Sequence, residues 1–226
     1  MKLIRKLTSA AVLLTVSSVS VATELETKQQ QFSYAMGVNL AGLLSTQGIS
    51  DIDGDALAAG INDVLGGKDL QLDLETMKTA IEEQREAIEK QAEQAAADKK
   101  KQGLVFLENN KKQSGVTVLE NGLQYQVVKA GDGDMPKATD KVKVHYHGTL
   151  TDGTVFDSSV ERGSPATFGL GQVIPGFREA ITRMKVGGTW KVYVPSDLGY
   201  GERGAGSSIG PNETLIFEIQ LLSIES

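Results

Sequence analysis

The hydrophobic residues of this 226-residue chain follow two different spacings. Across residues 24–112 they recur at helical intervals among Gln, Ala, Glu and Lys, and β-branched residues are few, a combination that favours helix. After Ser114-Gly115, apolar and polar residues alternate in short runs separated by glycine-containing turns, which is typical of strands. The pattern predicts a helical first half and a second half built on a β-sheet.

Three helices are predicted in the first half. The first covers residues 24–46. The second begins after Asp55, whose side chain is a good N-cap, and ends near Gly66-Gly67. The third begins near Asp73 and continues to about Lys112, so at about 1.5 Å per residue it is roughly 60 Å long.

The predicted long helix is mostly polar. Its apolar residues fall on a heptad-like seam, but Gln84 and Gln91 occupy two of the seam positions. A solvated rod is therefore expected instead of a strong coiled coil. Gly103 lies inside this rod and predicts a bend, because glycine weakens a helix by about 1 kcal/mol relative to alanine.

The two shorter helices carry apolar faces that they cannot cover alone. The long rod supplies too few apolar residues to cover them. We therefore expect residues 23–72 to form a homodimer with a second copy of the chain. The positions that need this partner surface are Leu40, Leu43, Leu44, Leu57, Ile61, Val64 and Leu65.

The second half predicts an α+β fold, in which an antiparallel sheet wraps on one short helix at Pro175–Met184. In one strand, Tyr146 and Gly148 share a face with apolar residues, while His145 and His147 share the other face. Trp190 is expected in the core. The predicted strands cover residues 116–118, 123–128, 142–150, 190–194 and 215–222.

The N-terminal residues predict a cellular location, and the charge of the chain argues against one class of function. Residues 1–22 have the basic start, apolar run and small-residue end (Ser20-Val21-Ala22) of a secretory signal peptide cleaved before Thr23, although a retained anchor is the alternative. The expected location is the periplasm, with outer-membrane association or export as variants, and with no membrane span left after cleavage. The formal charge of −6 and the absence of a basic block after residue 22 argue against a nucleic-acid partner.

Residues 115–226 resemble the FKBP-type peptidyl-prolyl cis–trans isomerases. With the helical region, the long helix and the signal peptide, the whole chain resembles the Mip (macrophage infectivity potentiator) and FkpA-like subfamily, whose members are homodimers. The resemblance divides the chain into a dimerisation region at 23–72, a connecting helix at 73–112 and an isomerase domain at 115–226. The motifs that carry it, in order, are Val144–Gly148, Asp152–Ser159, Gln172–Phe177, Met184–Gly187, Leu198–Gly201, Ile209–Pro211 and Leu215–Phe217.

The resemblance implies an apolar cup for a proline ring, without a cofactor or metal. Its implied catalytic residues are Tyr146, Phe156, Asp157, Tyr200 and Phe217. Substrate binding is implied for Phe168, Val173, Ile174, Phe177, Ile209 and Arg162. The Ile174 N–H and the Tyr200 hydroxyl would donate hydrogen bonds to substrate carbonyls, and Asp157 would lie beside the reacting carbonyl, oriented by Tyr146 and Arg162.

Two positions depart from the family pattern. Phe177 stands where many members have tryptophan, and Ala166 stands where a second aromatic wall is expected. Proline-containing folding proteins are the implied substrates. Macrolides are the implied inhibitors, and these two departures put their affinity in question more than they affect the isomerase activity.

Several alternatives remain at this point. A non-catalytic holdase, with helical arms that grip clients, competes with the enzyme. His145 and His147 offer two metal ligands without a third. The acidic run at 51–55 resembles a Ca²⁺ loop, but its glycine is misplaced and helix capping explains it better. Asn212-Glu213-Thr214 is a glycosylation sequon by its letters only.

Overall fold

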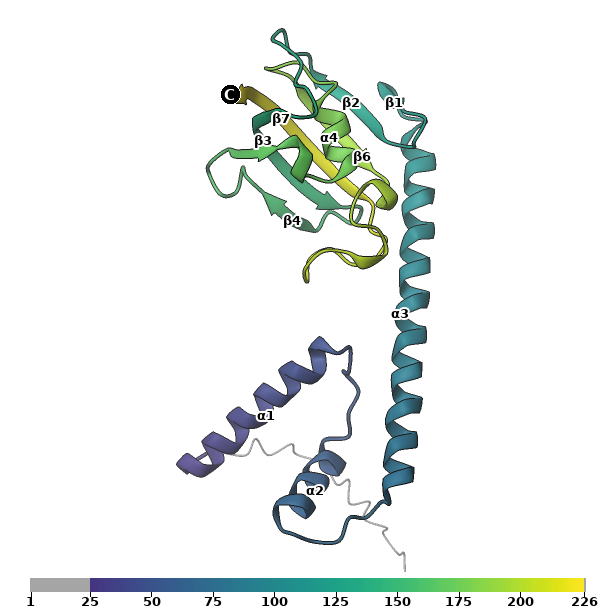
Figure 1. The fold of residues 1–226 in the computed structure, drawn as a ribbon, viewed down its shortest axis with the longest axis vertical. Helices are drawn as coiled ribbons and strands as arrows, with labels where there is room; N and C mark the ends of the chain where they lie inside the picture. The colour runs from purple at the N-terminus through teal and green to yellow at the C-terminus, as the bar shows by residue number, and fades with distance from the viewer. Residues whose placement is uncertain (1–24, 226) are drawn as a thin grey trace, which may run out of the picture. The chain divides into compact units, whose positions relative to one another are not determined.

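The computed structural model describes residues 25–225, so the predicted signal peptide at 1–22 lies outside the described residues. The chain forms two compact units, the first ending at Gln71 and the second beginning at Leu72 (Figure 1). None of the helices within 25–225 has both the length and the hydropathy that a membrane span requires.

The first unit contains α1 (Lys28–Thr46) and α2 (Gly54–Leu65). A capping box starts α1, in which the Thr27 side chain accepts from the Gln30 N–H and the Gln30 side chain accepts from the Thr27 N–H. The cap of α2 is Asp53, whose carboxylate accepts from the Ala56 N–H at 2.9 Å. The prediction of Asp55 as the cap was wrong, because the helix begins one residue earlier than Asp55 and places that residue in its first turn.

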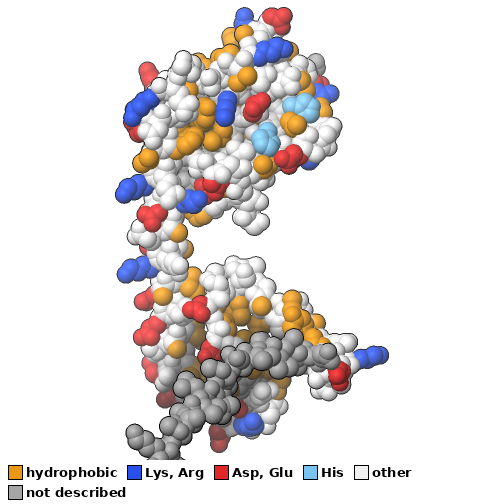
Figure 2. All heavy atoms as spheres, turned by 180° about the vertical axis from the view of Figure 1, so that it is seen from behind, with side chains coloured by type: hydrophobic (Ala, Val, Ile, Leu, Met, Phe, Trp, Pro, Cys, Tyr) orange, Lys and Arg blue, Asp and Glu red, His pale blue; other side chains and the backbone are white. Residues whose placement is uncertain are grey.

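The first unit leaves most of its hydrophobic side chains in solvent. No residue of α1 is buried, and Asp63 is the buried residue of α2. Figure 2 shows hydrophobic side chains on the surface of this unit. Those that are most exposed include Phe32, Tyr34, Met36, Val38, Leu43, Ile61, Val64 and Leu65.

The third helix, α3, runs from Leu74 to Asn110 and belongs to the second unit. Asp73 caps it by accepting from the Thr76 N–H at 2.7 Å. The predicted bend at Gly103 was wrong, because α3 continues through this residue as one helix (Figure 1). The glycine instead permits close packing, since a Cβ at this position would lie 2.2 Å from Thr214 Oγ1.

The C-terminal end of α3 packs against the sheet. The Asn110 side chain donates to Gln124 Oε1 at 2.9 Å, and the Gln124 amide donates to the Leu107 carbonyl at 3.0 Å. Phe106 meets Tyr193 with 6.0 Å between ring centroids. Earlier in the helix nearly every side chain is exposed, as expected for a solvated rod. The change in composition near Ser114 is therefore not the boundary of the packing unit.

Seven strands form one antiparallel sheet in the order β1-β2-β6-β7-β3-β4, and β5 pairs with the first part of β3. The five predicted strands are present, whereas β4 and β5, of four residues each, were not predicted because they are too short to show alternation. The bounds are β1 (Val116–Val118), β2 (Gln124–Lys129), β3 (Lys141–Leu150), β4 (Val155–Ser158), β5 (Ala166–Gly169), β6 (Thr189–Val194) and β7 (Leu215–Glu225).

A short helix, α4 (Pro175–Ile181), completes the core of the second unit. Proline at its first position fits the helix start. The predicted alternation in β3 is confirmed, because Val142, Val144 and Tyr146 are buried and the residues between them are not. Trp190 is also in the core and stacks on Tyr125, with ring centroids 4.2 Å apart.

Candidate active site

A pocket of about 240 Å³ opens at the surface of the second unit. It lies where β3, β4, β5, the start of α4, the segment after β6 and the strand β7 converge. Apolar and aromatic side chains form most of its wall. The lining residues are Tyr146, Phe156, Asp157, Phe168, Gln172, Val173, Ile174, Phe177, Tyr200 and Phe217.

Phe177 is the center of the aromatic cluster and is only 4% exposed. The α4 helix presents its ring edge-on to three neighbours, Phe217 at 5.1 Å, Tyr146 at 6.0 Å and Phe168 at 6.1 Å between centroids. Phe156 packs at right angles on Phe217 at 5.5 Å. Such edge-to-face contacts fix ring positions. The cup therefore has defined walls before any ligand enters.

Gly148 gives two of these rings their space. It lies opposite Asp157 on β4 and opposite Phe217 on β7. A Cβ here would lie 2.6 Å from Phe156 Cζ and 3.2 Å from Phe217 Cε1. Gly148 belongs to a motif that the sequence analysis named, but no role was predicted for it. Its role depends on how β4 and β7, which are far apart in the chain, both pair with β3.

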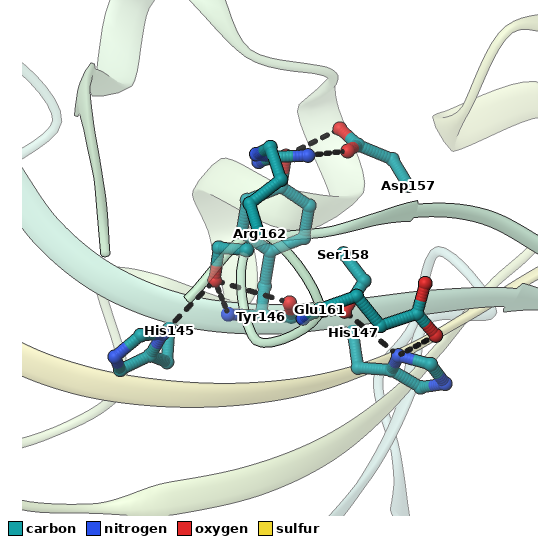
Figure 3. Close-up of polar contacts among 8 residues, drawn as sticks. His145, Tyr146, His147, Asp157, Ser158, Glu161 and Arg162 are labelled. Atoms are coloured by element: carbon teal, nitrogen blue, oxygen red, sulfur yellow. Dashed lines mark hydrogen bonds and ion pairs between the residues drawn. The ribbon is translucent and has the colours of Figure 1, made fainter. Parts of the chain in front are cut away.

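The pocket wall carries one carboxylate, that of Asp157, among the aromatic rings. The Asp157 carboxylate accepts a hydrogen bond from the Tyr146 hydroxyl and another from the Arg162 guanidinium (Figure 3). Arg162 also donates to the Tyr146 hydroxyl at 2.9 Å. The three side chains thus form a closed triangle, with Asp157 on the pocket side.

The triangle keeps Asp157 ionised. Partial burial by itself would raise its pKa, but the hydrogen bonds from Tyr146 and Arg162 and the guanidinium charge outweigh it, so the pKa is lower than usual. Burial raises the pKa of Tyr146, and its hydrogen bond to Asp157 adds to the rise. Tyr146 therefore remains a neutral donor at physiological pH, and Asp157 a carboxylate.

The two histidines support this network from the opposite face of β3. His145 Nδ1 lies 3.1 Å from Ser159 Oγ, and His147 Nδ1 lies 3.0 Å from Ser158 Oγ (Figure 3). Ser159 Oγ also accepts from the Tyr146 N–H at 2.8 Å. These contacts tie the turn that carries Arg162 to β3. In the described part of the chain, no group of three or more potential metal ligands gathers here or elsewhere.

The structure brings together all but two of the predicted site residues. Arg162 does not line the pocket and reaches it through Asp157 and Tyr146. Ile209 was expected at the rim but is 7% exposed and packs in the core, held by a β-bridge to Ala205. Gln172 lines the pocket and was missed, although it lies directly before Val173 in a recognised motif.

Comparison with known proteins identifies the class of protein that this fold and pocket define. Residues 133–222 match the FKBP-type peptidyl-prolyl cis–trans isomerase family, and residues 29–127 match the domain amino-terminal to such isomerases. The chain belongs to the FKBP-type peptidyl-prolyl cis–trans isomerase family and is an isomerase of this type.

The relatives place it further within the Mip and FkpA-like group. "Outer membrane protein MIP" of Legionella longbeachae is 43% identical over 100% of this chain and 98% of its own. The FKBP-type 22 kDa isomerase of Escherichia coli K12 is 46% identical over 88% of this chain and 97% of its own. The crystal structure of FkpA from Escherichia coli matches with a TM-score of 0.70 at 37% identity, covering 89% of this chain and 98% of that chain.

Proposed function

We propose that this protein accelerates rotation about Xaa-Pro bonds in proteins that fold outside the cytoplasm, by removing water from the bond and binding its twisted form. The observation that carries the proposal is the aromatic cup with one ionised side chain on its wall. Rotation of a peptide bond has a barrier of about 18–20 kcal/mol because it breaks amide resonance. The twisted imide is less polar than the planar one, so a dry apolar site favours it.

The proposed roles are those that the family resemblance implies, and the positions of the side chains around the pocket support them. The proline ring would lie in the cup against Phe177. Ile174 and Tyr200 both line the pocket, and the Ile174 N–H and the Tyr200 hydroxyl would hold the substrate chain by its carbonyls. Asp157, held by Tyr146 and Arg162, would lie beside the carbonyl of the rotating bond. No covalent bond forms, so the site needs no nucleophile.

Substitution at the pocket wall tests these roles. Phe156→Ala and Asp157→Leu should each lower kcat/KM on a proline tetrapeptide while the circular dichroism spectrum and melting temperature show a folded domain. Val155→Ala is a matched control, because Val155 lies next to Phe156 on β4 but is 41% exposed and does not line the pocket. Full activity in both pocket variants would show that the residue roles are wrong.

We further propose that residues 25–71 form a homodimer with a second copy and give the protein a chaperone-like grip on clients. The exposed hydrophobic residues of α1 and α2 support this, because a unit with so little core of its own needs a partner surface. The complete pocket favours an isomerase over a pure holdase. The sequence of residues 1–22 supports a periplasmic location, and a relative named as an outer membrane protein is consistent with it.

Removal of the helical unit separates the two activities. A chain beginning at residue 72 should be monomeric by sedimentation and should turn over tetrapeptides as the full chain does, since each pocket lies within one second unit. It should catalyse proline-limited refolding of a whole protein more slowly, because two linked pockets raise the effective concentration near a bound client. A monomeric full-length chain would remove the basis of the dimer proposal.

A further inference from the structure

The connection between β6 and β7, residues 195–214, is fastened to α3 by polar contacts. Lys99 Nζ pairs with Glu213 Oε1 at 2.9 Å, and the Glu213 side chain is 7% exposed. The side-chain amide of Asn212 donates to the Ala96 carbonyl at 3.1 Å, and Lys100 pairs with Asp197 at 3.1 Å. These contacts span about one turn of the helix and bind both ends of the connection.

Three consecutive polar residues in this connection are buried, Asn212, Glu213 and Thr214. Each of them meets α3, the first at a backbone carbonyl, the second at Lys99 and the third at Gly103. Buried polar groups are costly unless they have partners. The hydrogen bond to Glu213 also raises the Lys99 pKa, so the ammonium stays charged opposite the carboxylate.

The same connection carries the mouth of the pocket. The Asn212 N–H donates to the Gly201 carbonyl at 2.8 Å, and Gly201 directly follows Tyr200, a pocket-lining residue. Ile209 is bridged to Ala205 by two backbone hydrogen bonds and belongs to the same hydrophobic core as Phe177 and Phe217. A continuous path of contacts therefore leads from α3 through Asn212 to Tyr200.

The geometry points to Lys99 and the Ala96–Gly103 face of α3 as positioning elements of the isomerase site, which hold residues 195–214 so that Tyr200 is correctly placed at the pocket mouth. This inference rests on the proposed function of the pocket and assigns to it residues outside residues 115–226. Lys99 touches no substrate in this scheme and acts through Glu213. The helix that joins the two units is thereby also part of the site's frame.

The test compares neighbouring lysines in the full-length chain. Lys99→Met keeps the aliphatic stem and removes the charge, whereas Lys101→Met makes the same change at an exposed position two residues further. For Lys99→Met we expect kcat/KM on a proline tetrapeptide to fall about threefold to tenfold, or ~0.7–1.4 kcal/mol. The fall should lie mainly in KM, because Tyr200 would contact the substrate chain and not the rotating bond. Lys99→Arg keeps the positive charge, so its kcat/KM should be close to that of the wild type.

A second pair of variants acts through packing instead of charge. Gly103→Ala adds a methyl group against Thr214 and should displace α3 from the connection, although alanine favours helix. Gly103→Ala with Thr214→Ala removes the colliding Oγ1 and should recover activity. Both sets are also compared by the NMR amide shifts of Tyr200 and Ile209, which should move in Lys99→Met and Gly103→Ala and stay in Lys101→Met.

The outcomes distinguish a failure of the positioning inference from a failure of the proposed pocket function. If Lys99→Met matches Lys101→Met in kcat/KM and in both amide shifts, α3 does not position the mouth. A lower melting temperature with unchanged kinetics overturns the inference in the same way, by showing a structural role only. If the wild-type chain were inactive on every proline peptide, the proposed pocket function would fail, and the amide shifts would still decide whether α3 places Tyr200.

Discussion

Gly148→Ala is the sharpest test of how the pocket is built. The new Cβ would lie 2.6 Å from Phe156 Cζ, whereas carbon atoms in contact are normally about 3.5–4.0 Å apart. The Phe156 ring must therefore move by about 1 Å or more. Phe217 on the other side is 3.2 Å away and 5% exposed, so it has little room to retreat. Because Phe156 lines the pocket, its displacement should change the shape of the cup.

The expected magnitudes differ for stability and activity. Overpacking a closed core costs about 1–3 kcal/mol, but Phe156 borders open space, so the loss of unfolding free energy should be near the low end, about 1 kcal/mol. Catalysis is more sensitive, since a misplacement of about 1 Å costs up to roughly a hundredfold. We expect kcat/KM to fall between about tenfold and a hundredfold.

The assay is isomerisation of a proline tetrapeptide, with urea unfolding of the same preparations. Gly171→Ala is the matched control, because Gly171 directly precedes the pocket residue Gln172 and no atom lies within 4 Å of its added Cβ. Activity of Gly148→Ala within twofold of the control would contradict this account of the pocket. It would mean that the Phe156 ring does not need its present position.

Three further predictions concern Phe177 in the pocket, the triangle of Asp157, Tyr146 and Arg162, and the packing of the end of α3 against the sheet. Phe177→Trp should tighten macrolide binding, measured by inhibition of the tetrapeptide reaction, because a larger ring adds apolar contact at about 25 cal/mol per Å². Weaker inhibition would count against a contact between Phe177 and the bound ligand. The Asp157 pKa is lowered on folding, so its stabilising effect is complete above the ordinary carboxyl pKa of about 4 and is lost as the pH falls below it. The difference in unfolding free energy between wild type and Arg162→Ala should therefore shrink below about pH 4, and a constant difference down to pH 2 would contradict this. Asn110→Ala should lower the unfolding free energy by about 1–3 kcal/mol, because it leaves buried Gln124 Oε1 without its donor. Asn109→Ala, at an exposed position, should change it little. Equal urea midpoints for the two variants would show that the end of α3 does not pack on the sheet.

The order of elements and most of the pocket residues were predictable from the sequence for different reasons. The helices and long strands follow from periodicity, which is a local property. The pocket set came from the resemblance, since no local pattern separates Phe156 or Phe217 from ordinary core residues. Ile209 was expected at the pocket rim but is buried in the core. Its position depends on the β-bridge to Ala205, and the glycines around this turn do not specify that geometry in the sequence.

The roles of the glycines were the least predictable part. Gly103 makes space for Thr214, which is distant in sequence, and Gly148 makes space for Phe156 on the next strand and for Phe217 near the end of the chain. A glycine within a helical pattern indicates a weak point when only propensity is considered. Its effect reverses when a neighbour occupies the space of the missing Cβ, and that neighbour is known only from the tertiary structure.

The lysines of α3 show why composition did not reveal the contacts between this helix and residues 195–214. Lys99, Lys100 and Lys101 are consecutive, yet Lys99 pairs with buried Glu213, Lys100 pairs with exposed Asp197 and Lys101 is exposed. Successive helix positions are rotated by about 100°, so adjacent identical residues face different surroundings. A helix rich in charge can therefore carry a specific docking face without an apolar seam. The buried Glu213 carboxylate fixes Lys99, and Lys100 adds a second, more exposed pair to the same connection, so individual partners and not composition define this docking face.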